Sequence, residues 1–120
     1  MNIEEFRNFC LQLNGVTEDL PFDENTLVFK VGGKMFCAFG LNSFERINLK
    51  CDPERSLELR EEFLGIKAGY HMNKKHWNSI YTDSDVPWKL IQELTLHSYD
   101  LVFKSLSKKL QNEIEGFWDI

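Results

Sequence analysis

Two short runs rich in β-branched and aromatic residues constrain the fold of this chain more than any other feature. Thr26 to Val31 and Lys34 to Phe39 both have strand-like composition, and only Gly32 and Gly33 separate them. Two glycines between such runs are a strong β-hairpin signal, because glycine adopts the positive φ angles that a tight hairpin turn needs. An antiparallel pair is therefore expected, which argues against a doubly wound parallel sheet.

The segments around this hairpin predict an α+β fold. Apolar residues recur at helical spacing from Asn2 to Leu13 and from Val86 to Ser107, while Arg46 to Cys51 and His76 to Thr82 have strand-like composition. The remaining predicted segments are a loop from Gly15 to Asn25, a helix from Asp52 to about Phe63, a loop or short strand from Ile66 to Lys75, and a short helix within Lys108 to Ile120. Strands joined by tight turns form antiparallel sheets, so helices are expected to cover one face of this sheet.

Local signals mark where the helices should begin. Asn2 with Glu5 three residues later resembles a capping box, and Asp52 is a capping residue. Proline is favoured in the first helical turn because its missing N–H has no intrahelical partner there. Pro53 and Pro87 are therefore expected at first helical positions.

Length and composition predict a single cytoplasmic domain that covers residues 1–120. The chain has 42% hydrophobic residues, including ten phenylalanines, which is enough for a core without a metal or a disulfide. Its first residues include two acids, and no apolar run approaches the roughly 20 residues that span a bilayer, so no membrane partner is expected. Cys10, Cys37 and Cys51 are widely spaced and are expected to be reduced, mostly buried thiols.

Residues 65–82 form a basic and aromatic stretch in a chain of net charge −5. They hold two of the three histidines, two adjacent lysines and three aromatic residues. Lysines and histidines can contact phosphates, and aromatic rings can stack on bases. The candidate residues for anion or nucleic-acid binding are Lys34, Lys50, Tyr70, His71, Lys74, Lys75, His76 and Trp77. The alternative interpretation is an ordinary surface loop in which Tyr70 and Trp77 anchor the core.

The sequence contains no recognisable catalytic or metal-binding constellation. His71 and His76 are five residues apart, which does not match the i, i+4 spacing of helical metal ligands. Cys37 lies in a predicted central strand and is interpreted as an inert buried thiol. His97 lies within the apolar stripe of the long helix and is interpreted as a core histidine with a satisfied hydrogen bond. We therefore predict no catalytic residue, no metal and no cofactor.

Four segments, in this order, resemble the MmcQ/YjbR family of small bacterial proteins. They are P-F-D-x-x-T-x-V-F-K-V-G-G-K-M-F from Pro21, N-L-K-C-D-P from Asn48, G-Y-H-M-N-K-K-H-W from Gly69 and H-S-Y-D-L-V from His97. The resemblance extends over about residues 6–106, and its most specific segment is the one that begins at Gly69.

The resemblance implies a CyaY-like α+β fold, with an antiparallel sheet and helices on one side, related in shape to a double-wing DNA-binding domain. The family is described as DNA-binding on that similarity, so weak, salt-sensitive binding of DNA is the first functional hypothesis. A protein-interaction or regulatory domain is the second, with the basic stretch or the acidic loop from Glu18 to Glu24 as its contact surface. A small-ligand binder or enzyme is the third, and a concave pocket lined by Tyr70, His71 and Lys34 would favour it.

Overall fold

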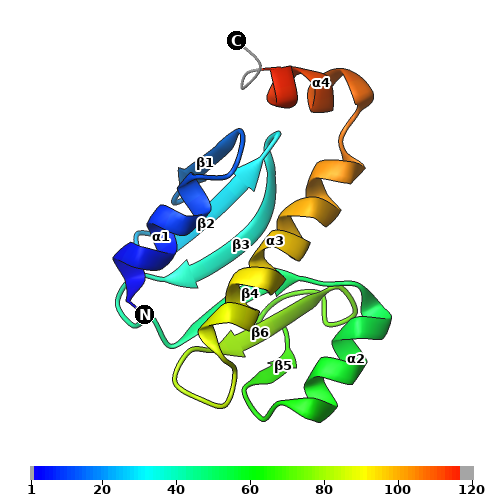
Figure 1. The fold of residues 1–120 in the computed structure, drawn as a ribbon. Coiled ribbons are helices and arrows are strands. Elements are labelled where there is room, and N and C mark those ends of the chain that lie inside the picture. Colours follow the sequence, from blue (N-terminus) through cyan, green and yellow to red (C-terminus); the bar gives the residue numbers. More distant parts are fainter. Residues whose placement is uncertain (1, 117–120) are drawn as a thin grey trace.

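The computed structural model describes residues 2–116 and contains a six-stranded antiparallel sheet with the order β1-β2-β3-β4-β6-β5. The elements are α1 (Ile3–Leu11), β1 (Val16–Asp19), β2 (Thr26–Val31), β3 (Lys34–Gly40), β4 (Arg46–Lys50), α2 (Pro53–Glu62), β5 (Ile66–Ala68), β6 (Trp77–Tyr81), α3 (Trp88–Ser105) and α4 (Lys108–Gly116). Helices α1 and α3 cross one face of the sheet, and α2 packs beside β5 and β6 (Figure 1). The predicted α+β class is confirmed, and so is the hairpin of β2 and β3.

The predicted helix starts follow from local hydrogen bonds. The side-chain oxygen of Asn2 accepts a hydrogen bond from the backbone N–H of Glu5 at 2.9 Å. Asp52 likewise accepts from the N–H of Arg55 at 3.1 Å, and Pro53 begins α2. Pro87 differs from the prediction because its extended backbone (ψ 146°) makes it the residue before α3 rather than the first residue in it.

The prediction of a loop from Gly15 to Asn25 was wrong for its first part, which forms strand β1. Val16 to Asp19 pair in antiparallel register with Val31 to Val28. Two acids in four residues give a weak strand signal, because Asp and Glu are depleted in strands. In the folded chain both acids form ion pairs: Glu18 pairs with Arg7 of α1, and Asp19 lies 3.7 Å from the Lys30 ammonium. The edge strand is therefore held by tertiary contacts that its own sequence does not show.

The core lies between the sheet and the helices and is rich in phenylalanine. Phe6 of α1 packs edge-on against Phe39 of β3, with ring centroids 5.6 Å apart, and against Trp88 of α3 at 5.9 Å. All three cysteines are buried free thiols, as predicted. Burial raises the pKa of the Cys37 and Cys51 thiols, so both stay protonated.

Helix α3 inserts a serine where β3 and β4 separate. The two strands pair only from Cys37↔Leu49 to Phe39↔Ile47. Beyond this point the Ser98 hydroxyl donates to the carbonyl of Phe36 and accepts from the N–H of Lys50 at 2.9 Å. The hydroxyl thus replaces the missing ladder bond.

The residues on either side of Ser98 also tether α3 to backbone groups. The ring Nε2 of His97 accepts from the N–H of Asp52 at 3.2 Å, and the Tyr99 hydroxyl donates to the carbonyl of Asn14 at 2.6 Å. Burial lowers the pKa of His97, which keeps the ring neutral and able to accept. The predicted satisfied histidine is confirmed, although it lies at the half-buried edge of the core.

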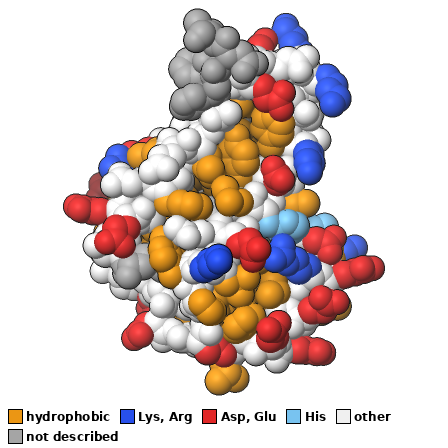
Figure 2. Space-filling view, viewed as in Figure 1, with side chains coloured by type: hydrophobic (Ala, Val, Ile, Leu, Met, Phe, Trp, Pro, Cys, Tyr) orange, Lys and Arg blue, Asp and Glu red, His pale blue; other side chains and the backbone are white. Residues whose placement is uncertain are grey.

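The face that carries the helices has mixed surface charge. Figure 2 shows acidic and basic side chains interspersed over it, with hydrophobic side chains exposed between them. Among the described residues, no helix is both long enough and apolar enough to cross a membrane.

Candidate functional site

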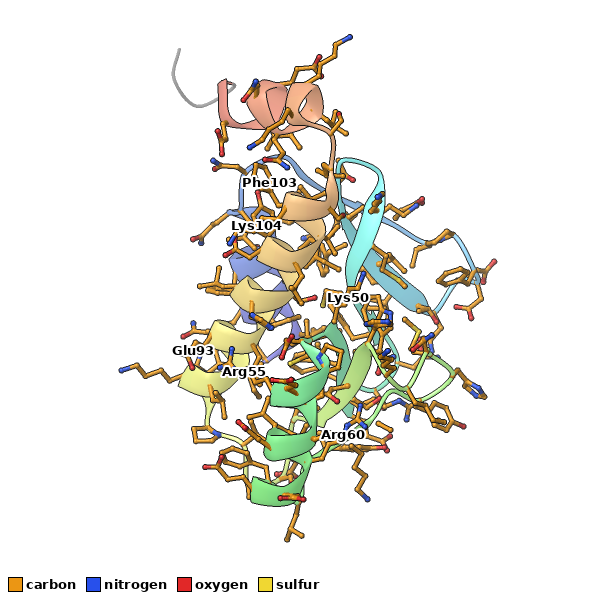
Figure 3. The ribbon with its side chains drawn as sticks, turned by 90° about the vertical axis from the view of Figure 1, so that its right-hand side faces the viewer. Lys50, Arg55, Arg60, Glu93, Phe103 and Lys104 are labelled. Carbon is orange, nitrogen blue, oxygen red and sulfur yellow. The ribbon has the colours of Figure 1, made fainter. Side chains whose placement is uncertain are left out.

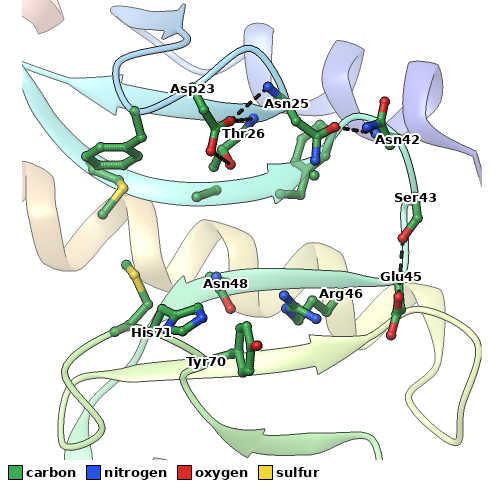
Figure 4. A pocket seen from close by; sticks show the side chains of 16 residues that line it. Asp23, Asn25, Thr26, Asn42, Ser43, Glu45, Arg46, Asn48, Tyr70 and His71 are labelled. Carbon is green, nitrogen blue, oxygen red and sulfur yellow. Dashed lines mark hydrogen bonds between the residues drawn. The ribbon is translucent and has the colours of Figure 1, made fainter.

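The face of the sheet opposite α1 and α3, which we call the open face, is hollowed into a pocket of about 500 Å³ (Figure 4). We call it the open-face pocket. Its floor includes Ala38 and Asn48, which are paired across β3 and β4 and alternate with the core residues Phe39 and Ile47. Segments 22–26 and 42–46 border one side, and residues 70–72 border the other.

An aspartate turn builds the first wall. The Asp23 carboxylate accepts hydrogen bonds from the backbone N–H groups of Asn25 at 2.8 Å and Thr26 at 2.7 Å, and from the Thr26 hydroxyl at 3.3 Å. These bonds, led by the one from Asn25, lower the pKa of Asp23. The side-chain oxygen of Asn25 accepts from the N–H of Asn42 at 2.7 Å, which joins the two segments of this wall. The amide nitrogen of Asn25 remains a donor.

The opposite wall is part of residues 69–76, the loop between β5 and β6. Backbone hydrogen bonds join the start of this loop to its end. Gly69 donates to the carbonyl of Trp77 at 2.8 Å, and Trp77 donates to the carbonyl of Asn73 at 2.9 Å. A Cβ at Gly69 would lie 2.8 Å from the Cβ of Trp77 and 3.0 Å from the Cβ of Met72, so only glycine fits there. The Asn73 side chain accepts from the N–H of Lys75 at 3.0 Å.

Arg60 of α2, labelled in Figure 3, fixes this loop from the other side of the sheet. Its guanidinium donates to the carbonyl of Lys74 at 2.6 Å, to the carbonyl of Trp77 at 3.3 Å and to the side-chain oxygen of Asn78 at 2.8 Å. The Asn78 amide in turn donates to Ser56 at 3.2 Å. Hydrogen bonds from α2 therefore hold this loop in a defined position against the rest of the fold.

A relay of hydrogen bonds orients the floor of the pocket. The N–H of Tyr70 donates to the hydroxyl of Ser79 at 2.8 Å. That hydroxyl, which is fully buried, donates onward to the side-chain oxygen of Asn48. Because the Asn48 oxygen is occupied in this way, its NH₂ group is left as a donor beside the pocket.

Arg46 lies over the ring of Tyr70, with the guanidinium carbon 4.1 Å from the ring centroid. The arginine forms no ion pair within residues 2–116. His71, with its ring centroid 4.1 Å from that of Tyr70, has a φ of 59° and is the only non-glycine residue with positive φ in the described part of the chain. Such a conformation is uncommon outside glycine and often accompanies functional sites.

The pocket brings together two of the eight candidate residues, Tyr70 and His71. Lys74 and Lys75 are exposed on the 69–76 loop, His76 is half-buried, and Trp77 is only 9% exposed. Lys34 and Lys50 do not line the pocket. Lys34 begins β3 at the hairpin turn, whereas Lys50 ends β4, where it is paired with Trp77 of β6.

Sequence reasoning missed most of the polar lining, above all Arg46, Asn48, Asp23 and Asn25. One signal for two of them was present. Arg46 and Asn48 alternate with the apolar Ile47 and Leu49 along a strand, which puts two polar residues next to each other on the face away from the core. Asp23 and Asn25 lie in the loop before β2, and the alternation of residues along a strand gives no information about how a loop folds.

The lining suits binding by hydrogen bonds and apolar contact. Donor groups of Arg46, Asn48 and Tyr70 stand beside the apolar side chains of Met35 and Met72. Across residues 2–116, no three His, Cys, Asp or Glu side chains gather in a way that could hold a metal ion.

Comparison with known proteins gives a family match. The family model described as YjbR matches residues 11–101. The protein YbdF of Escherichia coli O157:H7 is 38% identical over 112 residues, which is 92% of each chain. YjbR of Escherichia coli K12 is 27% identical over 100 residues, which is 82% of this chain and 85% of YjbR.

Solved structures have the same fold. Protein DR2400 of Deinococcus radiodurans superposes with a TM-score of 0.90 at 39% identity, covering 95% of this chain and 88% of DR2400. A Pseudomonas syringae protein superposes with a TM-score of 0.71 at 26% identity, covering 85% of this chain and 99% of its own. None of these names states an activity or a ligand.

Proposed function

The chain belongs to the YjbR family, and we propose that it is a binding module whose open-face pocket holds a small molecule. The observation that carries the proposal is a concave site of about 500 Å³ with both walls fixed by internal hydrogen bonds. Ligand sites are typically clefts of roughly 300–1,000 Å³ that are largely formed before the ligand arrives. A wall that is already ordered loses little conformational entropy on binding.

The lining supports binding of a molecule with both polar and apolar parts. Met35, Met72 and Ala38 offer apolar contact, while Arg46 and Asn48 offer donors. A few polar groups among apolar side chains fix the orientation of a ligand, and the apolar contact supplies most of the affinity.

The test is a fragment screen on ¹⁵N-labelled protein, followed by NMR chemical shifts. We expect ligands to shift the amides of Ala38, Asn48 and Tyr70. Thr26→Trp should abolish these shifts, because Thr26 lines the pocket and faces Gly40 across the strand pair, which leaves room for the indole. Thr17→Trp is the control, since Thr17 is exposed on β1 outside the pocket. A screen without shifts at these amides, or binding that survives Thr26→Trp, would refute the proposal.

Nucleic-acid binding by the basic and aromatic stretch is a second candidate. The observation that favours it is the pair Lys74 and Lys75, both exposed on the loop that also carries Tyr70 and His71. In this proposal Lys34, Lys50 and His76 add phosphate contacts, and Trp77 frames the site. The resulting binding is weak and sensitive to salt, because it depends on phosphate neutralisation by a chain of net charge −5.

Fluorescence anisotropy with a labelled DNA duplex at several salt concentrations tests this candidate. Replacing Lys74 and Lys75 with alanine should weaken binding and lower the slope of log K against log salt by about two, one for each phosphate contact. Lys108 and Lys109 on α4 are an adjacent, exposed pair that provides a control with the same charge change. Equal effects of the two double variants would contradict a specific role for the loop.

A further inference from the structure

We infer that the ligand of the open-face pocket is a small organic acid, whose carboxylate is held by Arg46 and Asn48 and whose apolar part packs on Met35, Met72 and Ala38. This inference rests on the proposed function and adds the chemical class of the ligand.

The pocket offers a ligand hydrogen-bond donors that the protein leaves free. Three side chains of the lining have acceptor oxygens that are engaged by the protein itself. Asp23 accepts three hydrogen bonds from its own turn, the Asn25 oxygen accepts from Asn42, and the Asn48 oxygen accepts from Ser79. The NH₂ groups of Asn25 and Asn48 are left over as donors. A ligand that accepts hydrogen bonds complements these donors.

Arg46 has a charge that no described acidic group pairs with. Its guanidinium forms no ion pair among residues 2–116, although Glu45 is its neighbour in sequence. The ring of Tyr70 lies against it at 4.1 Å and restricts its orientation. A planar guanidinium held in this way presents paired N–H donors that match the two oxygens of a carboxylate. Figure 4 shows Arg46 and Asn48 projecting from the same strand on the same side of the pocket.

The charged side chains of the lining limit the charge of the ligand. Arg46 and His71 are the basic residues of the lining, and Asp23 and Glu45 are its acids. Glu45 accepts a hydrogen bond from the Ser43 hydroxyl at 3.3 Å, toward one end of the pocket in Figure 4. Arg46 attracts any anionic group beside it, but the carboxylates of Asp23 and Glu45 repel a dianionic phosphate about twice as strongly as a monoanion. A monoanionic carboxylate therefore fits the site better than a phosphate ester.

The test compares three probes that share a phenyl ring: benzoate, its neutral isostere benzamide, and phenyl phosphate. Each is titrated into ¹⁵N-labelled protein, and the dissociation constant is taken from the shifts of Asn48 and Tyr70. We expect benzoate to bind at least about tenfold more tightly than benzamide, the usual effect of making a hydrogen-bonded acceptor ionic. Phenyl phosphate should bind more weakly than benzoate.

Variants of Arg46 and Asn48 test whether the preference for benzoate over benzamide arises in the pocket. Arg46→Gln should raise the dissociation constant of benzoate about tenfold and leave that of benzamide unchanged. Asn48→Asp keeps an oxygen for Ser79 and introduces a negative charge, so it should also weaken benzoate selectively, and it serves if Arg46→Gln does not fold. Arg55→Gln removes the same charge from α2 and is the control.

Tyr70 acts as a positioning residue, and its ring rather than its hydroxyl carries the effect. Tyr70→Phe should preserve the preference for benzoate over benzamide, whereas Tyr70→Ala should reduce it by releasing Arg46. A role in folding alone would lower the affinity for both probes equally.

The outcomes separate this inference from the proposed function. Equal binding of benzoate and benzamide, both abolished by Thr26→Trp, would overturn the organic-acid inference and leave small-molecule binding intact. Tighter binding of phenyl phosphate, or an unchanged benzoate constant in both Arg46→Gln and Asn48→Asp, would also overturn it. Failure of all three probes together with an empty fragment screen would overturn both.

Discussion

Arg46 and Tyr70 form a stacked pair beside the open-face pocket, with the guanidinium carbon 4.1 Å from the centroid of the ring. The two residues come from different parts of the chain: Arg46 begins β4, and Tyr70 lies in the loop that follows β5. Their contact joins the floor of the pocket to its wall. The position of this loop therefore governs whether the arginine is available to a ligand.

The positive φ of His71 should make a glycine at this position more stabilising than an alanine. Alanine normally stabilises a position relative to glycine, but a φ of 59° costs an L-residue about 1 kcal/mol. We expect His71→Gly to be more stable than His71→Ala by about that amount, measured by urea unfolding. At Lys75, whose φ is not positive, the same pair of substitutions should show no advantage for glycine. A His71→Ala protein as stable as His71→Gly would contradict the strained conformation.

Removal of Arg60 should loosen the 69–76 loop without unfolding the protein. Arg60 donates to the carbonyls of Lys74 and Trp77, so Arg60→Ala frees the loop from α2. Hydrogen exchange should become faster at the amides of Gly69, Met72 and Trp77, which are bonded within the loop. Arg55→Ala on the same helix is the control and should leave these amides unchanged, because Arg55 pairs with Glu93 at 3.9 Å instead.

Loss of the Ser98 hydroxyl should destabilise the fold. Ser98→Ala leaves the carbonyl of Phe36 and the N–H of Lys50 without their partner in the gap between β3 and β4. An unpaired buried polar group costs about 1–3 kcal/mol, so we expect a loss of roughly 2 kcal/mol or more in the free energy of unfolding. Ser105→Ala, at an exposed position near the end of α3, should change stability by much less. Similar losses for the two variants would show that the bridge contributes little.

The stability of the protein should fall as pH drops through the range in which His97 titrates. The folded-state pKa of His97 lies below its ordinary value of 6.5, mainly because burial disfavours the charged ring. The contribution of neutral His97 to the free energy of unfolding is therefore fully present above pH 6.5, and it is lost as the pH falls through the lower folded-state pKa. The melting temperature should decline below pH 6.5 in the parent protein and less so in His97→Gln, whose amide oxygen can still accept from Asp52. Identical pH profiles for the two proteins would exclude this role.

Local patterns predict most of the fold. Strand alternation with a glycine turn specified β2 and β3, and capping residues specified the starts of α1 and α2. Strand β1 could not be predicted because its two acids disfavour a strand until Arg7 and Lys30 meet them in the folded chain.

The site was less predictable than the fold. Tyr70 and His71 were identified because they lie in a compact and unusual stretch. Arg46 was missed because strand alternation places it on the face away from the core but does not show its contact with Tyr70, 24 positions later in the chain. Lys34 and Lys50 were predicted to join the same site, but neither lines the pocket, and Lys50 lies opposite Trp77 across β4 and β6.

The most direct measurement of the central claim is a set of intermolecular NOEs between benzoate and protein labelled with ¹³C at the methionine methyl groups. Met35 and Met72 both line the open-face pocket, where the apolar part of the ligand is expected. We expect NOEs from the ring protons of benzoate to both methyl groups, and we expect them to be lost in Arg46→Gln at the same ligand concentration. Benzoate that binds without an NOE to either methionine would contradict it.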